Sequence, residues 1–494
     1  MRIRAGSQPS KRFTRSRKEL ADARLSGLSQ GRRPPEQCAL LEELHLQRIR
    51  SLRPAILTLA LVSAGAHATN GYMSHGYGTA SKGMAGAGTA LPQDTLSVFN
   101  NPAGLVRLEK RYDVELELFS PIREYRANDD FAPPPAPSVP PGTYESNNDY
   151  FLIPGFGMSV PLSERSSVGV ALAAQGGMNT EYGTATFANF AAPAGSPQNP
   201  DGSFTASEPT GVDLAQLALG ITYARDLGPL AALGITRHSV GITPVFAAQR
   251  FKARGLQPFR ALSVSPENVT NNGYDYSYGA GVRIGWLASL LDERLDFGIS
   301  YQSKLWMTDF DDYQGLFANG GGFDIPAVFN VGLAFRITPR FIAVADYKRI
   351  FYGDVDALAN SNDVAFGEII SDPDQRLGGD DGLGFGWRDI NIYSFGLQYQ
   401  TSEKLTLRAG FSAADEPWDD INTLFNVLAP ATIKNHASVG ATYALDGDSR
   451  IGFAFTHAFE NTIDGTSQFT GPQTGYVRMH QDMLQLSYSR VIGK

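Results

Sequence analysis

The sequence predicts an all-β fold: a fourteen-stranded antiparallel transmembrane β-barrel with a small N-terminal hatch in its lumen. Two observations indicate the barrel. From about residue 112 onward, segments of about nine to fifteen residues alternate apolar with small or polar residues, which gives each strand one apolar and one polar face. The connections between these segments are alternately short and long, as expected for tight turns at one end of a barrel and long loops at the other.

The expected strands lie near 112–120, 149–160, 166–175, 213–225, 237–251, 274–287, 294–304, 328–337, 341–350, 389–400, 404–413, 435–445, 449–459 and 481–491. In Phe329–Ile337 every second residue is large and apolar, with Asn330, Gly332, Ala334 and Arg336 in the gaps. We expect lipid to contact the first set and the lumen to take the second. Leu295–Tyr301 and Tyr393–Tyr399 follow the same pattern, and His457 lies on the apolar side of its segment, as a girdle residue would.

The connection lengths also predict the orientation. Short connections such as Thr338–Arg340 and Asp446–Asp448 should face the periplasm, and the connections after odd strands, about twenty to forty residues long, should face outside. A soluble β-sandwich also alternates, but its strands average ~5–6 residues and its loops lack this rhythm of two lengths.

Composition narrows the class of protein. For 494 residues, 52 glycines, 11% aromatic residues and a mean hydropathy of −0.19 do not fit a helical membrane protein, and no segment reaches the ~18 apolar residues of a spanning helix. Residues 69–494 hold 29 basic and 45 acidic residues, which argues against a nucleic-acid binder. Cys38 is the only cysteine and lies before this part.

The front of the chain divides into three parts. Residues 48–68 read as a signal peptide, with basic residues, a short apolar run and an Ala66-His67-Ala68 cleavage site, so the mature chain should begin at Thr69. Residues 1–47 are an Arg-rich extension, expected to be disordered or to reflect a start site assigned too far upstream; a long n-region or regulatory tail is the alternative. Residues 69–111 would form the hatch, and 112–494 the barrel.

The hatch segment lacks alternation and is rich in small residues that allow close backbone approach. It reads Gly76-Tyr77-Gly78, then Lys82-Gly83-Met84-Ala85-Gly86-Ala87-Gly88, Pro92-Gln93-Asp94 and Asn101-Pro102-Ala103-Gly104. These motifs resemble the N-terminal hatch of the FadL/TodX outer-membrane transporters. Phe323–Ala327 and Leu407–Phe411 resemble the barrel of the same family.

The resemblance implies a fourteen-stranded plugged barrel for passive uptake of long-chain fatty acids or hydrocarbons, with a hatch-gated lateral exit. It also implies a substrate path and hatch that include Gly83, Gly86, Gly88, Phe99, Asn101, Pro102 and Ala103. A kink in the third strand makes the lateral gap in the family, and Gly176 and Gly177 suit such a kink. The two glycines would equally suit the start of the next loop. Family barrels commonly end on an aromatic residue, whereas this chain ends on Lys494, and its nearest aromatic residue is Tyr488.

Several charges fall on the lumen side of their strands: Glu115, Glu117, Arg283, Asp296, Asp346, Lys348 and Arg408. In an open porin such charges tune ion flow. In a plugged barrel they should instead pair with one another and with the hatch, because unpaired charge away from water is costly. We favour the second role.

No catalytic or metal motif is present. The sequence lacks H-E-x-x-H, C-x-x-C and G-x-S-x-G elements, although a barrel phospholipase could assemble serine and histidine from neighbouring strands without one. Aspartates in the outer loops could bind calcium, but we favour the interpretation that they are solvated surface charges. We therefore expect a transporter with no enzyme activity, no cofactor and no metal.

We further expect a monomer in the outer membrane of a Gram-negative bacterium. Its partners would be a hydrophobic small molecule, outer-membrane lipid with lipopolysaccharide, and the barrel-assembly machinery. The rival functions are a general diffusion porin for polar solutes, which has no need of an N-terminal plug, and an adhesin or receptor that works through its long loops.

Overall fold

The computed structural model describes residues 70–131, 137–190 and 208–493. The expected extension 1–47, the signal peptide 48–68 and the start at Thr69 lie outside these residues. Among the helices described, none is both long and apolar enough to cross a membrane.

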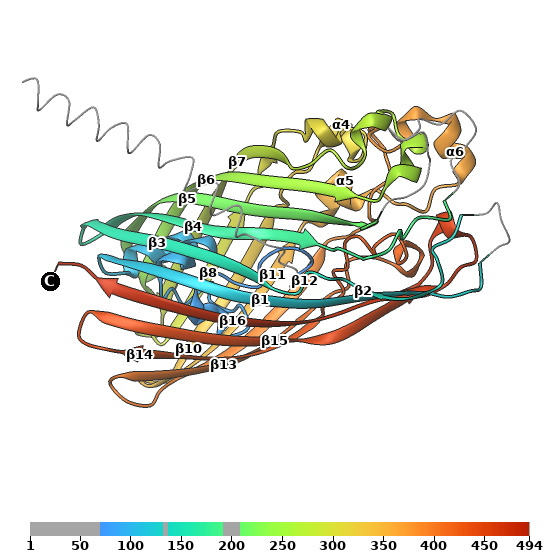
Figure 1. Ribbon diagram of the computed structural model, residues 1–494. Coiled ribbons are helices and arrows are strands. Elements are labelled where there is room, and N and C mark those ends of the chain that lie inside the picture. The colour runs from blue at the N-terminus through green and yellow to red at the C-terminus, as the bar shows by residue number, and fades with distance from the viewer. Residues whose placement is uncertain (1–69, 132–136, 191–207, 494) are drawn as a thin grey trace, which may run out of the picture. The chain divides into compact units, whose positions relative to one another are not determined.

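Fourteen antiparallel strands close into a barrel (Figure 1), because the last strand pairs with the first from Arg111 opposite Val491 to Ala127 opposite Gly475. The barrel strands are β1 (Arg111–Ala127), β3 (Phe151–Ser163), β4 (Ser166–Asn179), β5 (Gly211–Leu230), β6 (Ile235–Arg254), β7 (Asp275–Leu290), β8 (Leu295–Gln302), β10 (Val328–Thr338), β11 (Phe341–Ile350), β12 (Ile390–Gln400), β13 (Leu405–Ala414), β14 (Asn435–Ala444), β15 (Ser449–Gly465) and β16 (Gly475–Val491). Two short strands, β2 (Gly142–Glu145) and β9 (Trp306–Met307), pair with the loop ends of β1 and β7. The predicted number of strands is confirmed.

The two faces of the wall also follow the prediction. On β12, Phe395 is 59% exposed, whereas its neighbour Ser394 is 6% exposed and points inward. On β10, Leu333 is 43% exposed and Asn330 is buried. Alternation at a period of two therefore turns an apolar belt to lipid and small or polar residues to the lumen.

The predicted connections after the first and the thirteenth strands are too long, since β1 continues to Ala127 and the last two strands are also longer than predicted. The thirteenth and fourteenth strands extend toward each other, so their loop runs only from Gly465 to Gly475. The hydrophobic pattern reverses in this part of the wall: Val477 and Met479 are buried inside, while Arg478 and His480 lie outside. A search for outward apolar residues misses these ends of β15 and β16. Here the wall extends beyond the apolar belt, and its apolar side chains pack inward against the loops.

Short helices occupy the hatch and the long loops. The hatch lies inside the ring of strands, and most loop helices gather at one end of the barrel (Figure 1). The hatch contains α3 (Thr79–Lys82) and the 3₁₀ helices η1 (Thr95–Phe99) and η2 (Pro102–Arg107). The connections contain η3 (Ala231–Leu233), η4 (Gln257–Leu262), η5 (Pro266–Asn268), η6 (Asp311–Tyr313), α4 (Ala318–Gly321), η7 (Tyr352–Asp354), α5 (Asp356–Ala359), α6 (Phe366–Ser371), η8 (Pro373–Gln375), η9 (Asp420–Asn422) and η10 (Gln468–Thr470).

The outward face gives a stability prediction. Phe395→Arg, in the middle of β12, should lower the free energy of unfolding in lipid vesicles by roughly 2–4 kcal/mol, because a cation would enter the hydrocarbon. Tyr399→Arg, near the short-turn end of the same strand, should cost about 1 kcal/mol or less. Urea titrations of the two variants would measure both values, and equal costs would contradict the assignment of this face to lipid.

Candidate functional site

The Asn-Pro-Ala motif of the hatch docks against glycines of the wall. The Asn101 carboxamide oxygen accepts the N–H of Ala103 at 3.1 Å, and its nitrogen donates to the carbonyls of Thr89 at 3.1 Å and Trp286 at 3.0 Å. A Cβ on wall residue Gly285 would lie 2.1 Å from the Asn101 side-chain oxygen. Only a residue without a side chain lets this turn approach β7.

Pro102 and Phe99 use the same kind of contact. A Cβ on Gly241 of β6 would lie 2.3 Å from the carbonyl carbon of Pro102, and one on Gly220 of β5 would lie 3.3 Å from the Phe99 ring. Phe99 is fully buried, with its ring 5.3 Å from that of Tyr77. Glycines on the inner face of the wall thus leave room for large side chains of the hatch.

The hatch glycines expected from the sequence lie at close contacts. A Cβ on Gly83 would meet Gly440 of the wall at 3.0 Å, and Gly86, at a φ of +83°, would meet the carbonyl oxygen of His75 at 2.4 Å. Gly88 donates its N–H to Asp346 at 2.8 Å. The hatch closes on itself at Gly86 and on the barrel at the other two.

Six of the seven inward charges bond to hatch residues. The pairs are Glu115 with Thr79, Glu117 with Lys82 at 2.6 Å, Asp296 with Arg107 at 2.8 Å, Asp346 with the N–H groups of Gly88 and Thr89, Lys348 with the carbonyl of His75 at 3.2 Å, and Arg408 with Gln93 at 2.6 Å. Arg283, the seventh, bonds to Gln302 of the neighbouring strand at 2.6 Å. Through these contacts six of the lumen charges join the wall to the hatch.

Burial shifts the pKa of several hatch side chains, among them His75 and Asp94. Burial, then the stacked His436 ring and the nearby lysines, holds the pKa of His75 well below its usual range. Burial and the Asp113 carboxylate raise the pKa of Asp94 to about 7. His75 is therefore neutral at neutral pH when the hatch is docked.

β3 and β4 separate along part of their length. Their pairing runs from Ser163–Ser166 to Phe156–Leu172, and the next backbone hydrogen bond between the two chain segments joins Asn147 to Glu181 at 2.8 Å. Among the described residues, no backbone hydrogen bond joins Phe151–Gly155 to Ala173–Asn179, although β4 still pairs with β5 there. We call these two facing stretches the window.

Gly176 and Gly177 lie inside β4 at the window and do not begin the loop. The register against β5 shifts between Ala174 and Gly176, so Gln175 is the extra residue of a β-bulge. A bulge bends its strand. This is the third barrel strand, on which the sequence analysis placed a possible kink.

The first residues of the hatch bond to the bent strand. We call Asn70–Ser74 the N-terminal segment. Its Ser74 donates to the carbonyl of Gln175 at 2.9 Å, and the carbonyl of Tyr72 accepts the N–H of Gly177 at 3.0 Å. The segment therefore occupies the edge of β4 that β3 leaves without a partner.

An apolar pocket lies among the long loops. Its volume is about 30 Å³, far below the roughly 150 Å³ of an apolar cavity that admits benzene. Its lining is Met178, Val212, Phe251, Leu256, Phe259, Leu316, Phe317, Ala357, Leu377, Leu383, Gly384, Phe385, Phe425 and Leu428. The lining is apolar, as in a hydrophobic binding site, but its side chains pack against one another and leave no room for a ligand.

A smaller cavity, of about 10 Å³, adjoins the N-terminal segment and is lined by two cationic side chains. Arg283 and Lys348 both line it, with Asn330, Met73 and Ser74. The Nε and Nη1 atoms of Arg283 are buried without a hydrogen-bond partner, and no carboxylate of the described residues forms a salt bridge with this guanidinium. A buried cation in this state is set to accept an anion.

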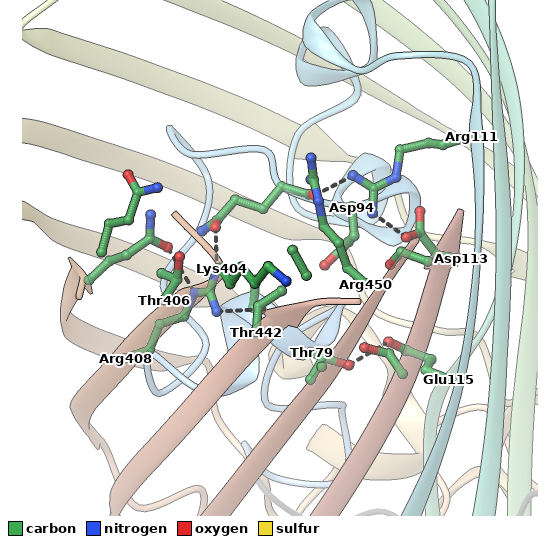
Figure 2. A pocket seen from close by; sticks show the side chains of 18 of the residues that line it. Thr79, Asp94, Arg111, Asp113, Glu115, Lys404, Thr406, Arg408, Thr442 and Arg450 are labelled. Atoms are coloured by element: carbon green, nitrogen blue, oxygen red, sulfur yellow. Dashed lines mark hydrogen bonds and ion pairs between the residues drawn. The ribbon is translucent and has the colours of Figure 1, made fainter. Parts of the chain in front are cut away.

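A polar hollow of about 440 Å³ lies on the other side of the hatch, toward the short turns. Figure 2 shows its charged lining, in which Arg111 and Asp113 face one another beside Asp94. Lys404 and Arg450 come from the short-turn ends of β13 and β15. We call this hollow the vestibule, and the hatch separates it from the apolar pocket.

Sequence reasoning missed the cluster of buried aromatic side chains against which the N-terminal segment packs. Tyr352, Trp387 and Trp418 are almost fully buried, yet they lie in long loops that carry no periodic pattern. The one available signal is that large aromatic residues seldom occur in solvated loops.

A closed barrel that is plugged by its own N-terminal hatch defines a class of hatch-filled outer-membrane channel. The family model described as outer membrane protein transport protein (OMPP1/FadL/TodX) matches residues 59–482. The chain belongs to this family. No curated protein matches the sequence.

Solved structures share the fold. The toluene transporter TodX of Pseudomonas putida is 19% identical, with a TM-score of 0.60 over 85% of this chain and 99% of that one. A Pseudomonas aeruginosa FadL homologue is 15% identical, with a TM-score of 0.61 over 86% and 100%. The Ralstonia pickettii toluene transporter TbuX is 16% identical, with a TM-score of 0.53 over 85% and 99%.

The glycine contacts give a test of hatch docking. Gly285→Val should displace the Asn101-Pro102 turn, because its Cβ would overlap the Asn101 side-chain oxygen. The barrel should still fold and shift on heating in gel electrophoresis, while its ion conductance in planar bilayers should rise several-fold. Gly447→Val, at a turn glycine with open space around it, is the matched control. Unchanged conductance in a folded Gly285→Val barrel would contradict the docking role.

Proposed function

We propose that this protein admits hydrophobic small molecules through the outer membrane by passive diffusion. The molecule would enter the apolar pocket among the loops, move past the N-terminal segment, and leave sideways through the window. The observation that carries this path is the bulged third strand, whose free edge is occupied by the N-terminal segment and not by β3.

The hatch argues against a general porin. Nearly every residue from Asn70 to Leu105 is buried, and the hatch makes polar contacts to strands around the whole ring, from β1 to β16. An open aqueous path for polar solutes needs a free lumen. A lateral exit needs only the displacement of a few residues beside one strand.

The names of the similar structures leave two kinds of substrate open, since one set carries toluene and another is named after FadL. Arg283 and Lys348 favour a molecule with an apolar body and an anionic end, such as a long-chain fatty acid. A neutral hydrocarbon would leave Arg283 buried without an anion, which costs free energy. We therefore propose a fatty acid or a similar amphiphile as the substrate class.

Deletion of Gln175 tests the lateral path. Removing the extra residue of the bulge should restore regular pairing of β4 and close the window, so uptake of laurate by cells that lack the native protein should fall at least about tenfold. Gln175→Ala keeps the residue count and should retain most uptake. Full uptake by a correctly folded deletion variant would rule out exit at this window.

Arg283→Met tests the substrate class. The lost charge-assisted contact should raise the laurate concentration for half-maximal uptake roughly tenfold, while toluene uptake should stay unchanged. Lys404→Met, which removes a cation from the vestibule on the other side of the hatch, should alter neither. An equal effect of Arg283→Met on both molecules would point to a structural role for this arginine.

A further inference from the structure

The Tyr352 hydroxyl makes all of its hydrogen bonds to the N-terminal segment. The hydroxyl accepts the N–H groups of Tyr72 and Met73, each at 3.2 Å, and donates to the carbonyl of Asn70 at 2.5 Å. A phenol has one donor and two acceptor lone pairs, so all three are used. The tyrosine is fully buried, and its ring centroid lies 5.4 Å from that of Tyr72.

Gly71 shows how closely this contact is built. Its φ is +65°, a conformation that glycine adopts without strain. A Cβ at this position would lie 2.5 Å from the Tyr352 hydroxyl oxygen. The bend at Gly71 brings the carbonyl and the two N–H groups around one oxygen atom.

The same segment binds the window. Its Ser74 and Tyr72 make backbone hydrogen bonds to Gln175 and Gly177 of the bulged β4. Tyr352 therefore helps to fix the piece of chain that covers the free edge of β4. Releasing its hydroxyl would remove three hydrogen bonds and leave the two bonds to β4 and the contacts of the Tyr72 ring with Phe323 and Trp387.

Tyr352 is also continuous with the apolar pocket. It begins the loop between β11 and β12, and its ring makes an edge contact at 5.1 Å with Trp387, at the far end of that loop. Trp387 donates to Asn426 at 2.7 Å, and Asn426 donates to the carbonyl of Phe385 at 2.8 Å. Phe385 lines the pocket.

The pocket is too small for a substrate unless its lining moves, and much of that lining comes from this loop. Of its lining, Ala357, Leu377, Leu383, Gly384 and Phe385 all belong to the β11–β12 loop. A molecule that opens the pocket on this side displaces these residues and, through Trp387, the ring of Tyr352. Entry among the loops is thereby mechanically connected to the N-terminal segment at the window.

We propose that Tyr352 is a positioning residue that latches the N-terminal segment over the window and releases it when an apolar molecule enters the loop pocket. This inference rests on the proposed function for its direction, from loop pocket to window. The contacts at the Tyr352 hydroxyl belong to this chain's own residues and do not depend on the identity of the substrate.

The latch is tested by the reactivity of a cysteine in the N-terminal segment. Ser74→Cys, in a chain with Cys38→Ala, places a thiol at a position that is 6% exposed and adjacent to β4. In the purified barrel it should react slowly with a methanethiosulfonate reagent. Saturating laurate or toluene should accelerate the reaction about tenfold if either opens the loop pocket.

Tyr352→Phe keeps the ring and removes the hydroxyl. In this background the thiol should react about tenfold faster without any probe, and laurate or toluene should add less than about twofold. Gly71→Ala should give the same result from the other side, because its methyl would push the hydroxyl away. Faster basal reaction together with loss of the probe response is a signature that a general loss of stability would not produce.

Tyr313→Phe is the matched control. Tyr313 is also fully buried in a long loop, donates to the carbonyl of Gly273 at 2.6 Å and accepts the N–H of Ala253 at 3.2 Å, but it does not contact the N-terminal segment. It should behave as the parent chain. Reaction rates and probe responses equal to the parent in both Tyr352→Phe and Gly71→Ala would overturn the latch.

Folding is checked by heat-modifiable migration. If one variant does not form the barrel, the other decides. Failure of both would also overturn the proposal, because a latch on a movable segment is not required for barrel assembly. If the parent chain transports neither probe into liposomes while Tyr352→Phe still raises thiol reactivity, the proposed function fails and the latch stands. If the parent chain transports a probe while Tyr352→Phe leaves the thiol reactivity unchanged, the proposed function stands and the latch fails.

Discussion

Everything in this molecule depends on burying a polar plug inside a ring of strands whose inner face is also polar. Water is displaced where the two meet, so each donor, acceptor and charge needs a partner on the opposite surface. Asp346 illustrates the solution: one carboxylate oxygen accepts the N–H groups of both Gly88 and Thr89 at 2.8 Å. Lys82 and Glu117 form a second such contact, with both side chains almost fully buried. Removing one partner of a pair of this kind leaves a charge stranded and is far more destabilising than the pair is stabilising.

Volume sets the second condition. The lumen of fourteen strands is wider than side chains alone can fill, yet the hatch approaches the wall to backbone distance at Gly241, Gly285, Gly410 and Gly440. Glycines on inward-facing positions allow this approach, and the outward-facing neighbours remain large and apolar. The same alternation therefore serves lipid on one face and the hatch on the other.

The extent of the sequence prediction follows from these physical origins. The strands, their number and their lipid face could be predicted because a period of two is a local property, visible in a segment such as Phe329–Ile337. The prediction was wrong at the loop between β15 and β16, where Val477 and Met479 turn inward and the outward residues become polar. The hatch was recognised from its motifs. The inward charges were identified from their positions in the alternation of each strand. Which of them meet, and the contact of Tyr72 with a tyrosine 280 residues later, depend on how the ring closes and leave no mark in either local sequence.

The kinds of contact also divide the hatch into a fixed part and a movable part. The region from Thr79 to Arg107 is held by ionic contacts, including Lys82 with Glu117 and Arg107 with Asp296, and hydrogen bonds to charged groups contribute about 1.5–3 kcal/mol each. The N-terminal segment is held by bonds between neutral groups, to Tyr352, Gln175 and Gly177, which contribute roughly 0.5–1.5 kcal/mol each.

A passive channel has no energy source beyond thermal motion and the binding of its substrate, and a ligand shifts a conformational equilibrium only by its difference in affinity for the two states. Displacing the five residues Asn70–Ser74 breaks hydrogen bonds between neutral groups and exposes the side chains of Tyr72 and Met73. Undocking the whole hatch would in addition break several buried ionic contacts and so needs a larger difference in affinity. The distribution of charge between hatch and wall thus favours opening at the one end of the hatch that borders the window, as the proposed path requires.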